Sequence, residues 1–213
     1  MTTIFQQMRW SILAVFCLST MAQAAGDAIG KVEQQQGAVH VLNKNTAARP
    51  LRMQAPVWLG ETVASAKQAY VVLRMVDGAA IQVLANSQLQ FQHYRYQGES
   101  DDGVHLQLLQ GGLRTVTGVL GKQSPASYRV GTPVGTLGGH GRYQAKILAN
   151  GSVRIHVEQG TVSFANQAGV GLIQAGEEAL VANRSTPIQI HPLGNATGSA
   201  GKPASEGVKA AAS

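Results

Sequence analysis

The sequence has 213 residues, of which 44% are hydrophobic, 13% are charged and 25 are glycine. Charged residues are about half as frequent as in average soluble domains, and glycine is well above its usual share of ~7%. This composition excludes collagen, coiled coils and a fully disordered chain, which would combine low hydrophobicity with high net charge. A glycine-rich, weakly charged globular domain remains, and the chain is long enough to bury a core.

The N-terminal segment has the features of a secretory signal. Arg9 is the only charged residue before Asp27, and it directly precedes the short apolar stretch Trp10–Ala22. This stretch ends in Ala22-Gln23-Ala24, which has small residues at the positions that signal peptidase requires. We therefore expect residues 1–24 to be a cleaved signal peptide and the mature protein to be periplasmic. An uncleaved membrane anchor is the alternative.

Removal of this segment also restricts the chemistry of the mature chain. The single cysteine, Cys17, lies within it, so the mature chain has no thiol for a disulfide scaffold or a thiol enzyme. No apolar run reaches the ~18–20 residues of a membrane-spanning helix, so we expect no span after cleavage. Lys and Arg exceed Asp and Glu by 17 to 11, but the basic residues are spread singly. Export argues against nucleic acid, and an envelope protein or an anionic envelope polymer is the expected partner.

The mature chain alternates apolar and polar residues with a period of two, which is typical of β-strands. Clear runs occur at residues 71–75, 104–108, 153–157 and 162–164. Between such runs lie dipeptides that contain glycine, namely Asp77-Gly78, Gly111-Gly112, Gly138-Gly139 and Asn150-Gly151. Asn-Gly between apolar runs indicates a hairpin, because a type I′ turn needs positive φ twice.

We therefore predict an all-β domain of about eleven short strands with no helix beyond the signal peptide. The pattern Gln-Gly-x-apolar begins at Gln36, Gln110 and Gln159. Its recurrence indicates similar turns, stacked either in a Gly-rich sandwich or in a short solenoid-like β domain.

The composition changes sharply near the C-terminus. Gly194–Ser213 consists almost entirely of Gly, Ala, Ser, Lys, Pro and Asn. Such a segment has few large apolar side chains to offset the entropy lost on ordering. We assign residues 25–192 to the β domain and predict that residues 193–213 form a disordered tail.

Residues with catalytic or metal-binding potential form no recognisable motif. The six histidines are His40, His93, His105, His140, His156 and His191. They lack metal-ligand spacings such as H-E-x-x-H, and no G-x-S-x-G nucleophile motif occurs. Gly131–Gly141 lacks the Gly-Lys-Ser/Thr ending of a phosphate-binding loop, so we interpret its glycines as close strand crossings. We predict no catalytic, cofactor or metal site; an enzyme that depends on His105 or His140 is the alternative.

Several short elements extend along the chain, and one of them lies in the same stretch. In chain order they are Gly30-Lys31-Val32, Leu59-Gly60-Glu61-Thr62-Val63, Asp77-Gly78-Ala79-Ala80-Ile81, Asn86-Ser87-Gln88-Leu89, Gly112-Leu113-Arg114-Thr115-Val116, Thr132-Pro133-Val134-Gly135-Thr136-Leu137-Gly138, Glu158-Gln159-Gly160-Thr161-Val162 and Ala175-Gly176-Glu177-Glu178. In kind and order these elements resemble those of the periplasmic domain of the FecR family, named for the iron-dicitrate transport regulator. Together they cover about residues 29–183.

The resemblance implies a regulator with a cytoplasmic sigma-binding segment, one membrane helix and a periplasmic sensing part. Nine residues precede the apolar stretch here, too few for a sigma-binding segment, and little chain follows Ala175-Gly176 for a receptor-docking subdomain. We therefore expect a free-standing exported form. Gly139-His140-Gly141-Arg142 stands where the family has Val-Arg-Gly-Thr, so the roles of that Arg and Thr are not transferred.

Three functions are compatible with these features. The sequence leaves the partner, the strand edge that binds it and the oligomeric state open. The first function is a non-enzymatic periplasmic binding or sensing module that contacts an envelope partner in signal transduction, in its specific form linked to iron. A structural or adhesion-like envelope scaffold is the second, and an enzyme is the third. We favour the binding module.

Overall fold

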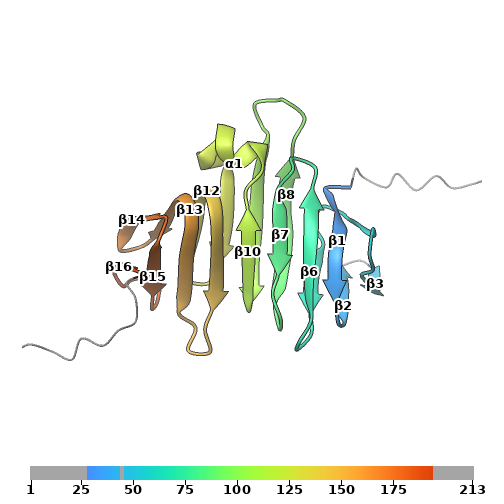
Figure 1. The fold of residues 1–213 in the computed structure, drawn as a ribbon, viewed down its shortest axis with the longest axis horizontal. Coiled ribbons are helices and arrows are strands. Elements are labelled where there is room, and N and C mark those ends of the chain that lie inside the picture. Colours follow the sequence, from blue (N-terminus) through green and yellow to red (C-terminus); the bar gives the residue numbers. More distant parts are fainter. Residues whose placement is uncertain (1–27, 44–45, 194–213) are drawn as a thin grey trace, which may run out of the picture.

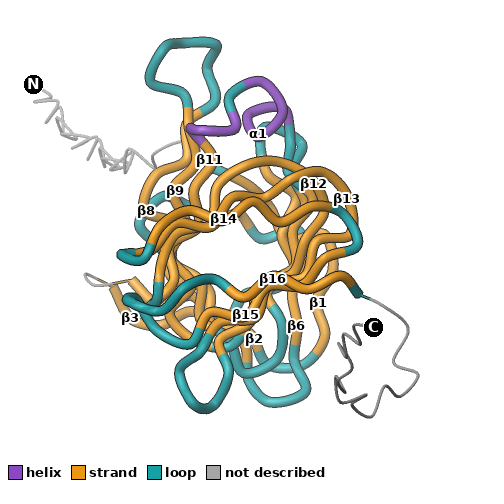
Figure 2. The backbone as a smooth tube through the Cα atoms, turned by 90° about the vertical axis from the view of Figure 1, so that its left-hand side faces the viewer, coloured by secondary structure: helices purple, strands orange, loops and turns teal. Residues whose placement is uncertain are grey.

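The computed structural model describes residues 28–43 and 46–193. In these residues, sixteen strands form one hydrogen-bonded sheet. The sheet curls back on itself, so that two layers of strands face each other across an interior (Figure 1, Figure 2). The predicted all-β fold is thus confirmed, as a curled sheet with the layers of a sandwich.

The two layers, A and B, are defined by the order of the strands along the sheet. Layer A contains β4 (Pro56–Val57), β1 (Gly30–Gln36), β6 (Tyr70–Met75), β7 (Ala80–Val83), β10 (Gly112–Val116), β15 (Glu177–Val181) and β16 (Gln189–Pro192). Layer B contains β3 (Thr46–Pro50), β2 (Val39–Asn43), β5 (Thr62–Ser65), β8 (Gln88–Arg95), β9 (Gly103–Gln110), β11 (Tyr128–Thr132) and β14 (Gly169–Gln174). Paired strands in the described residues are antiparallel, except that β9 and β11 are parallel.

One long hairpin belongs to both layers. It consists of β12 (Gly135–Ile147) and β13 (Val153–Asn166), joined by the predicted turn at Asn150-Gly151. The start of β12 pairs with β11 in layer B, whereas its later part, residues 142–146, pairs with β10 in layer A. In the same way β13 pairs first with β15 and then with β14. The hairpin therefore bends from one layer into the other and connects them.

Glycines make this bend possible. Gly139, Gly141 and Gly160 have φ of 109°, 134° and 84°, which side chains other than glycine rarely adopt. A Cβ atom at Gly141 would lie 1.9 Å from the carbonyl oxygen of Gln159. The predicted close strand crossing in Gly131–Gly141 is therefore present, and it lies within β12.

The recurring Gln-Gly pattern marks the places where the chain crosses between layers. Gly37 lies between β1 of layer A and β2 of layer B, and Gly111 lies between β9 of layer B and β10 of layer A. Gly160 lies in the bend of β13. All three have positive φ, between 71° and 84°. The pattern thus predicts a corner at which glycine adopts the left-handed backbone conformation, and a strand follows this corner.

The predicted inward-facing residues form the core between the layers. The buried members of the alternating runs are Val71, Leu73, Met75, Val104, Leu106, Leu108, Val153, Ile155, Val157, Val162 and Phe164. The strands are more numerous than expected because several, such as β4, are too short to show alternation. Where no helix was expected, a single turn, α1 (Val119–Gln123), precedes the 3-10 turn η1 (Pro125–Ser127). It is too short to produce a helical sequence period.

Two predicted segments lie largely outside the described residues. These are the signal peptide at residues 1–24 and the tail at residues 193–213, of which only residue 193 is described. Within residues 28–43 and 46–193, no helix has the length and apolar character needed to cross a membrane.

The Asp77-Gly78 turn joins β6 to β7, as predicted, and it contains a buried carboxylate. The carboxylate of Asp77 accepts hydrogen bonds from the Tyr94 hydroxyl at 2.5 Å and from the Ala79 N–H at 3.1 Å. The Asp77 carbonyl accepts one from the Val119 N–H at 3.0 Å. Asp77 therefore holds the turn, β8 and the start of α1 together.

We expect Asp77→Ala to lower the free energy of unfolding by about 3 kcal/mol, because it leaves buried donors without an acceptor. Urea unfolding of the purified variant measures this loss. Glu33→Ala is the matched control, since it removes an exposed carboxylate that pairs with Arg74, and should cost less than about 1 kcal/mol. Equal losses in the two variants would contradict a role for the buried network.

Candidate binding groove

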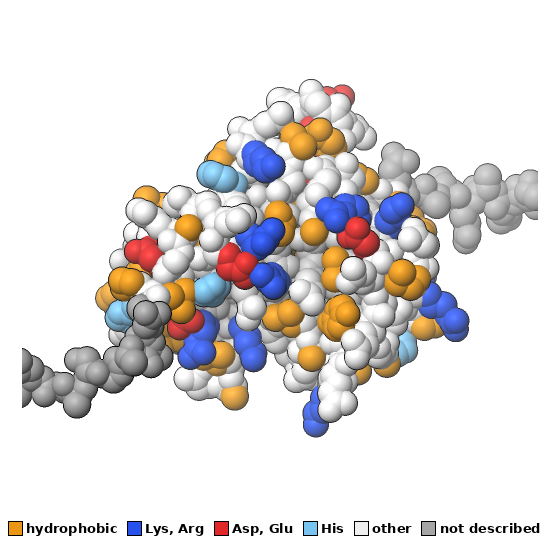
Figure 3. Space-filling view, in the orientation of Figure 1, with side chains coloured by type: hydrophobic (Ala, Val, Ile, Leu, Met, Phe, Trp, Pro, Cys, Tyr) orange, Lys and Arg blue, Asp and Glu red, His pale blue; other side chains and the backbone are white. Residues whose placement is uncertain are grey.

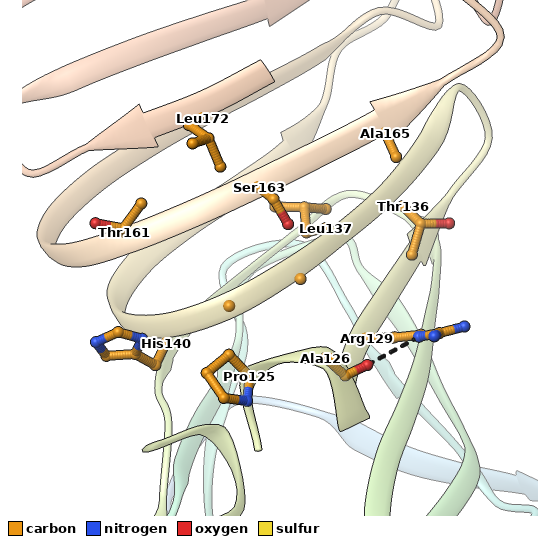
Figure 4. Close-up of a pocket in the computed structure, with 12 residues that line it drawn as sticks. Pro125, Ala126, Arg129, Thr136, Leu137, His140, Thr161, Ser163, Ala165 and Leu172 are labelled. Carbon is orange, nitrogen blue, oxygen red and sulfur yellow. Dashed lines mark hydrogen bonds between the residues drawn. The ribbon is translucent and has the colours of Figure 1, made fainter. Parts of the chain in front are cut away.

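A groove of about 710 Å³ crosses the outer face of layer B (Figure 4). Small side chains of β12 and β13 form its floor, namely Thr136, Gly138, Thr161, Ser163 and Ala165. Pro125 and Ala126 of η1 project on one side of this floor, and Leu172 of β14 on the other. The groove therefore exists because a floor of small residues lies between taller rims.

The local sequence explains this floor. In β13, Val162 and Phe164 point into the core and are fully buried, so Ser163 and Ala165 point outward. Gly138 on β12 is directly opposite Ser163 in the strand register. A Cβ atom at Gly138 would already lie 3.1 Å from the Ser163 hydroxyl oxygen.

The groove continues into a second hollow of about 400 Å³. The two share Thr136 and Ala165, and the second extends to Arg184 in the loop after β15. Arg184 donates a hydrogen bond from Nε to the Pro133 carbonyl at 2.7 Å. Arg129 on β11 is held in the same way, because its Nε donates to the Ala126 carbonyl at 3.1 Å (Figure 4).

Strand β14 supplies an apolar rim and a free strand edge. Among the described strands it pairs with β13 only. Val170 and Leu172 on its outer side are 71% and 61% exposed. Exposed apolar side chains beside an unpaired strand edge are typical of surfaces that contact other proteins.

The predicted candidates for chemistry are scattered. Of the six histidines only His140 lines the groove, and His40, His105 and His191 are exposed on other strands. No group of three His, Cys, Asp or Glu side chains in the described part of the chain could hold a metal ion. The groove is thus lined mainly by small side chains, with the cations Arg129 and Arg184 and the single histidine His140.

The core contains three buried tyrosines that remain uncharged, Tyr94, Tyr128 and Tyr143. Burial raises the pKa of the Tyr128 hydroxyl above its usual value, and nearby Asp77 adds to this. Burial also raises the pKa of Tyr94 and of Tyr143, in both cases with a further contribution from Tyr128. These hydroxyls remain protonated at neutral pH and act as structural groups of the core.

The residues of the family-like motifs mainly stabilise corners. The buried Glu61 carboxylate accepts the Trp58 N–H at 2.9 Å and pairs with Arg49 at 2.9 Å. Arg49 in turn lies 4.6 Å from the centre of the Trp58 ring, a cation–π distance. The Ser87 hydroxyl accepts the Gly112 N–H at 2.8 Å. These corner motifs therefore preserve the fold, whereas the motifs at residues 132–138 and 158–162 contribute Thr136, Gly138 and Thr161 to the groove floor.

Sequence reasoning did not identify the groove, because Gly, Ala, Ser and Thr carry no chemical signature. The available signal was the outward-facing series Thr161, Ser163 and Ala165, whose members are all small. Such a series leaves a low surface if the neighbouring elements project, and this depends on long-range pairing.

The chain is similar to a known family and to a few solved structures. Residues 61–163 match the model of the FecR protein family. Two crystal structures of a proposed anti-sigma factor from Parabacteroides distasonis ATCC 8503 match with a TM-score of 0.50 and 14% identity. The match covers 62% of this chain and 59% of that protein, and at this identity the likeness concerns the fold alone.

A cell surface anchoring domain is 32% identical over 30% of this chain and 83% of its own, with a TM-score of 0.29. No curated protein matches the chain at a significant level. The family match contains the corners at Gly111 and Gly160, most of the long hairpin and most of the groove floor, and it lies within the region of the sequence resemblance. The resemblance to the FecR family is therefore confirmed over residues 61–163 of this chain.

Proposed function

We propose that this chain is a non-enzymatic regulatory module of signal transduction that binds a protein partner of the cell envelope in its groove. The FecR match supports a regulatory role, since this family is regulatory rather than catalytic. The fold shared with a proposed anti-sigma factor is consistent with it.

The observation that carries the proposal is the groove itself. Its floor is small and smooth, and its rim at Leu172 is apolar and exposed. It continues past Ala165 into the second hollow, so that it is long enough for a segment of polypeptide rather than a compact metabolite. Strand β14 forms one rim through Leu172, and its edge opposite β13 is unpaired among the described strands, which favours an extended segment as the bound element.

The location and the signal are further parts of the proposal. The secretory features of residues 1–24 support binding in the periplasm. The resemblance to the iron-dicitrate regulator supports a role in regulation linked to iron. Under this proposal the module reports the state of an envelope protein to a partner that crosses the inner membrane.

The test fills the groove without touching the core. Ala165 is exposed on the floor, and a tryptophan there would occupy the space where a partner segment lies. We expect Ala165→Trp to reduce capture of the partner at least about tenfold, the loss typical of a blocked interface centre. The measurement is cross-linking of a tagged copy in living cells, followed by mass spectrometry of the captured proteins.

Ala149→Trp is the matched control, because Ala149 is exposed in the turn at the other end of the same hairpin. It should capture the partner as the unaltered protein does. Equal capture by the two tryptophan variants would exclude the groove as the binding site. Recovery of only peptidoglycan or the most abundant envelope proteins would instead favour the envelope scaffold.

A further inference from the structure

We infer that the groove selects an acidic, extended segment of the partner protein, and that Arg129 and Arg184 recognise its carboxylates. This inference rests on the proposed function, and it adds the chemical class of the segment that binds. It follows from how arginines are paired over the described part of the chain.

Most arginines in the described residues are neutralised by a carboxylate. Five of them form ion pairs, namely Arg49, Arg74, Arg95, Arg114 and Arg154. Arg129 and Arg184 form none, and both lie along the groove. The positive charge beside the groove is therefore not compensated by a carboxylate of residues 28–43 or 46–193.

Both guanidinium groups are held in place without using their terminal nitrogens. Among the described residues each donates its Nε alone, Arg129 to the Ala126 carbonyl and Arg184 to the Pro133 carbonyl. The backbone contact restricts the side chain, so that less rotamer entropy is lost when a ligand binds. The two terminal nitrogens of each group remain available for a carboxylate, which they can bind in a bidentate manner.

The surroundings add no opposing charge. None of the described residues that line the groove or its continuation is Asp or Glu, and His140 is the other ionisable lining residue. Arg129 and Arg184 would thus attract a segment that carries carboxylates and repel a basic segment.

The spacing of the two anchors matches an extended chain. Arg129 is four residues before Pro133, at which Arg184 is held. At the rise of a β-strand, the Arg129 backbone and Pro133 are separated by on the order of 13 Å. An extended segment covers that distance in three or four residues, so we expect acidic residues at that spacing in the partner.

The test uses labelled, capped octapeptides and fluorescence anisotropy with the purified full chain. One peptide has Glu four residues apart on a Thr/Val background, and two others have Gln or Lys at the same positions. We expect the Glu peptide to bind about tenfold or more tightly than the Gln peptide, because two guanidinium groups contribute. Added salt should weaken this binding, since the groove is open to solvent.

Charge reversal identifies the residues responsible. The double variant R129E/R184E should lose the preference for the Glu peptide and bind the Lys peptide instead. Arg52→Glu is the matched control, since Arg52 is another exposed arginine outside the ion pairs and lies away from the groove. It should retain the preference unchanged.

Equal affinity for the Glu and Gln peptides, or no binding of any peptide, would overturn the inference. So would a preference that survives in R129E/R184E. These results are separate from the test of the groove in cells: if Ala165→Trp loses the partner while charge reversal changes nothing, the groove binds but does not select acidic segments.

Discussion

Gly141→Ala is expected to prevent the domain from folding stably. The new Cβ atom would lie 1.9 Å from the Gln159 carbonyl oxygen, which belongs to the backbone of the paired strand. The φ of 134° is also outside the range that alanine adopts. We expect a loss of more than about 4 kcal/mol, comparable with the whole stability of a small domain. Soluble yield and a thermal melt followed by circular dichroism would show it.

Gly151→Ala provides the control within the same hairpin. Gly151 also has positive φ, at 82°, but nothing lies within 4 Å of the position of its Cβ. Only the backbone penalty of about 1–2 kcal/mol applies there. If the Gly141 variant were as stable as the Gly151 variant, the close crossing between the layers would not be required for the fold.

Alkaline pH is expected to unfold the protein through its buried tyrosines. The pKa of Tyr94, Tyr128 and Tyr143 is raised in the folded state, chiefly by burial, so their folded hydroxyls remain protonated. In the unfolded chain the same groups ionise near pH ~10. The contribution to stability is therefore fully present below that pH and is lost as pH rises above it. At pH ~11 each tyrosine lowers the free energy of unfolding by about 1.4 kcal/mol, and the three together lower it by roughly 4 kcal/mol.

Urea unfolding at pH 9 and pH 11 measures this loss. Tyr143→Phe removes one of the three ionisable groups and should reduce the loss by about one third. Tyr96→Phe is the control, because Tyr96 is 40% exposed and lies outside the buried set. The loss should be smaller in Tyr143→Phe than in this control. An identical loss in the two variants would show that the buried tyrosines do not govern alkaline unfolding.

Local features of the fold could be predicted from the sequence because they depend on neighbouring residues. The alternation at residues 71–75 determines which side chains enter the core, whatever the strand pairs with. The hairpin at Asn150-Gly151 likewise depends on a local preference, that of Gly151 for its φ of 82°. Asn150 has no positive φ, so the turn is not the type I′ turn that the sequence predicted. The Gln-Gly pattern identified the corners, although the sequence did not indicate that each one changes layers.

Long-range features could not be predicted in this way. The parallel pairing of β9 with β11 and the division of β12 between two layers depend on contacts that alternation does not encode. The groove also depends on the strand register, which places Gly138 opposite Ser163. Arg129 and Arg184 are far apart in sequence, and only the fold brings them to one groove.

The hairpin shared by the two layers has a consequence for the order of folding. Its strands are joined by a turn of five residues, 148–152, so its pairing closes a small loop and loses little chain entropy. Other pairings, such as that of β1 with β6 within layer A, join more distant segments. Contacts of short sequence separation form faster. The β12–β13 hairpin is therefore suited to form early and to act as the template on which both layers assemble, with the chain on either side of it adding outward in two directions.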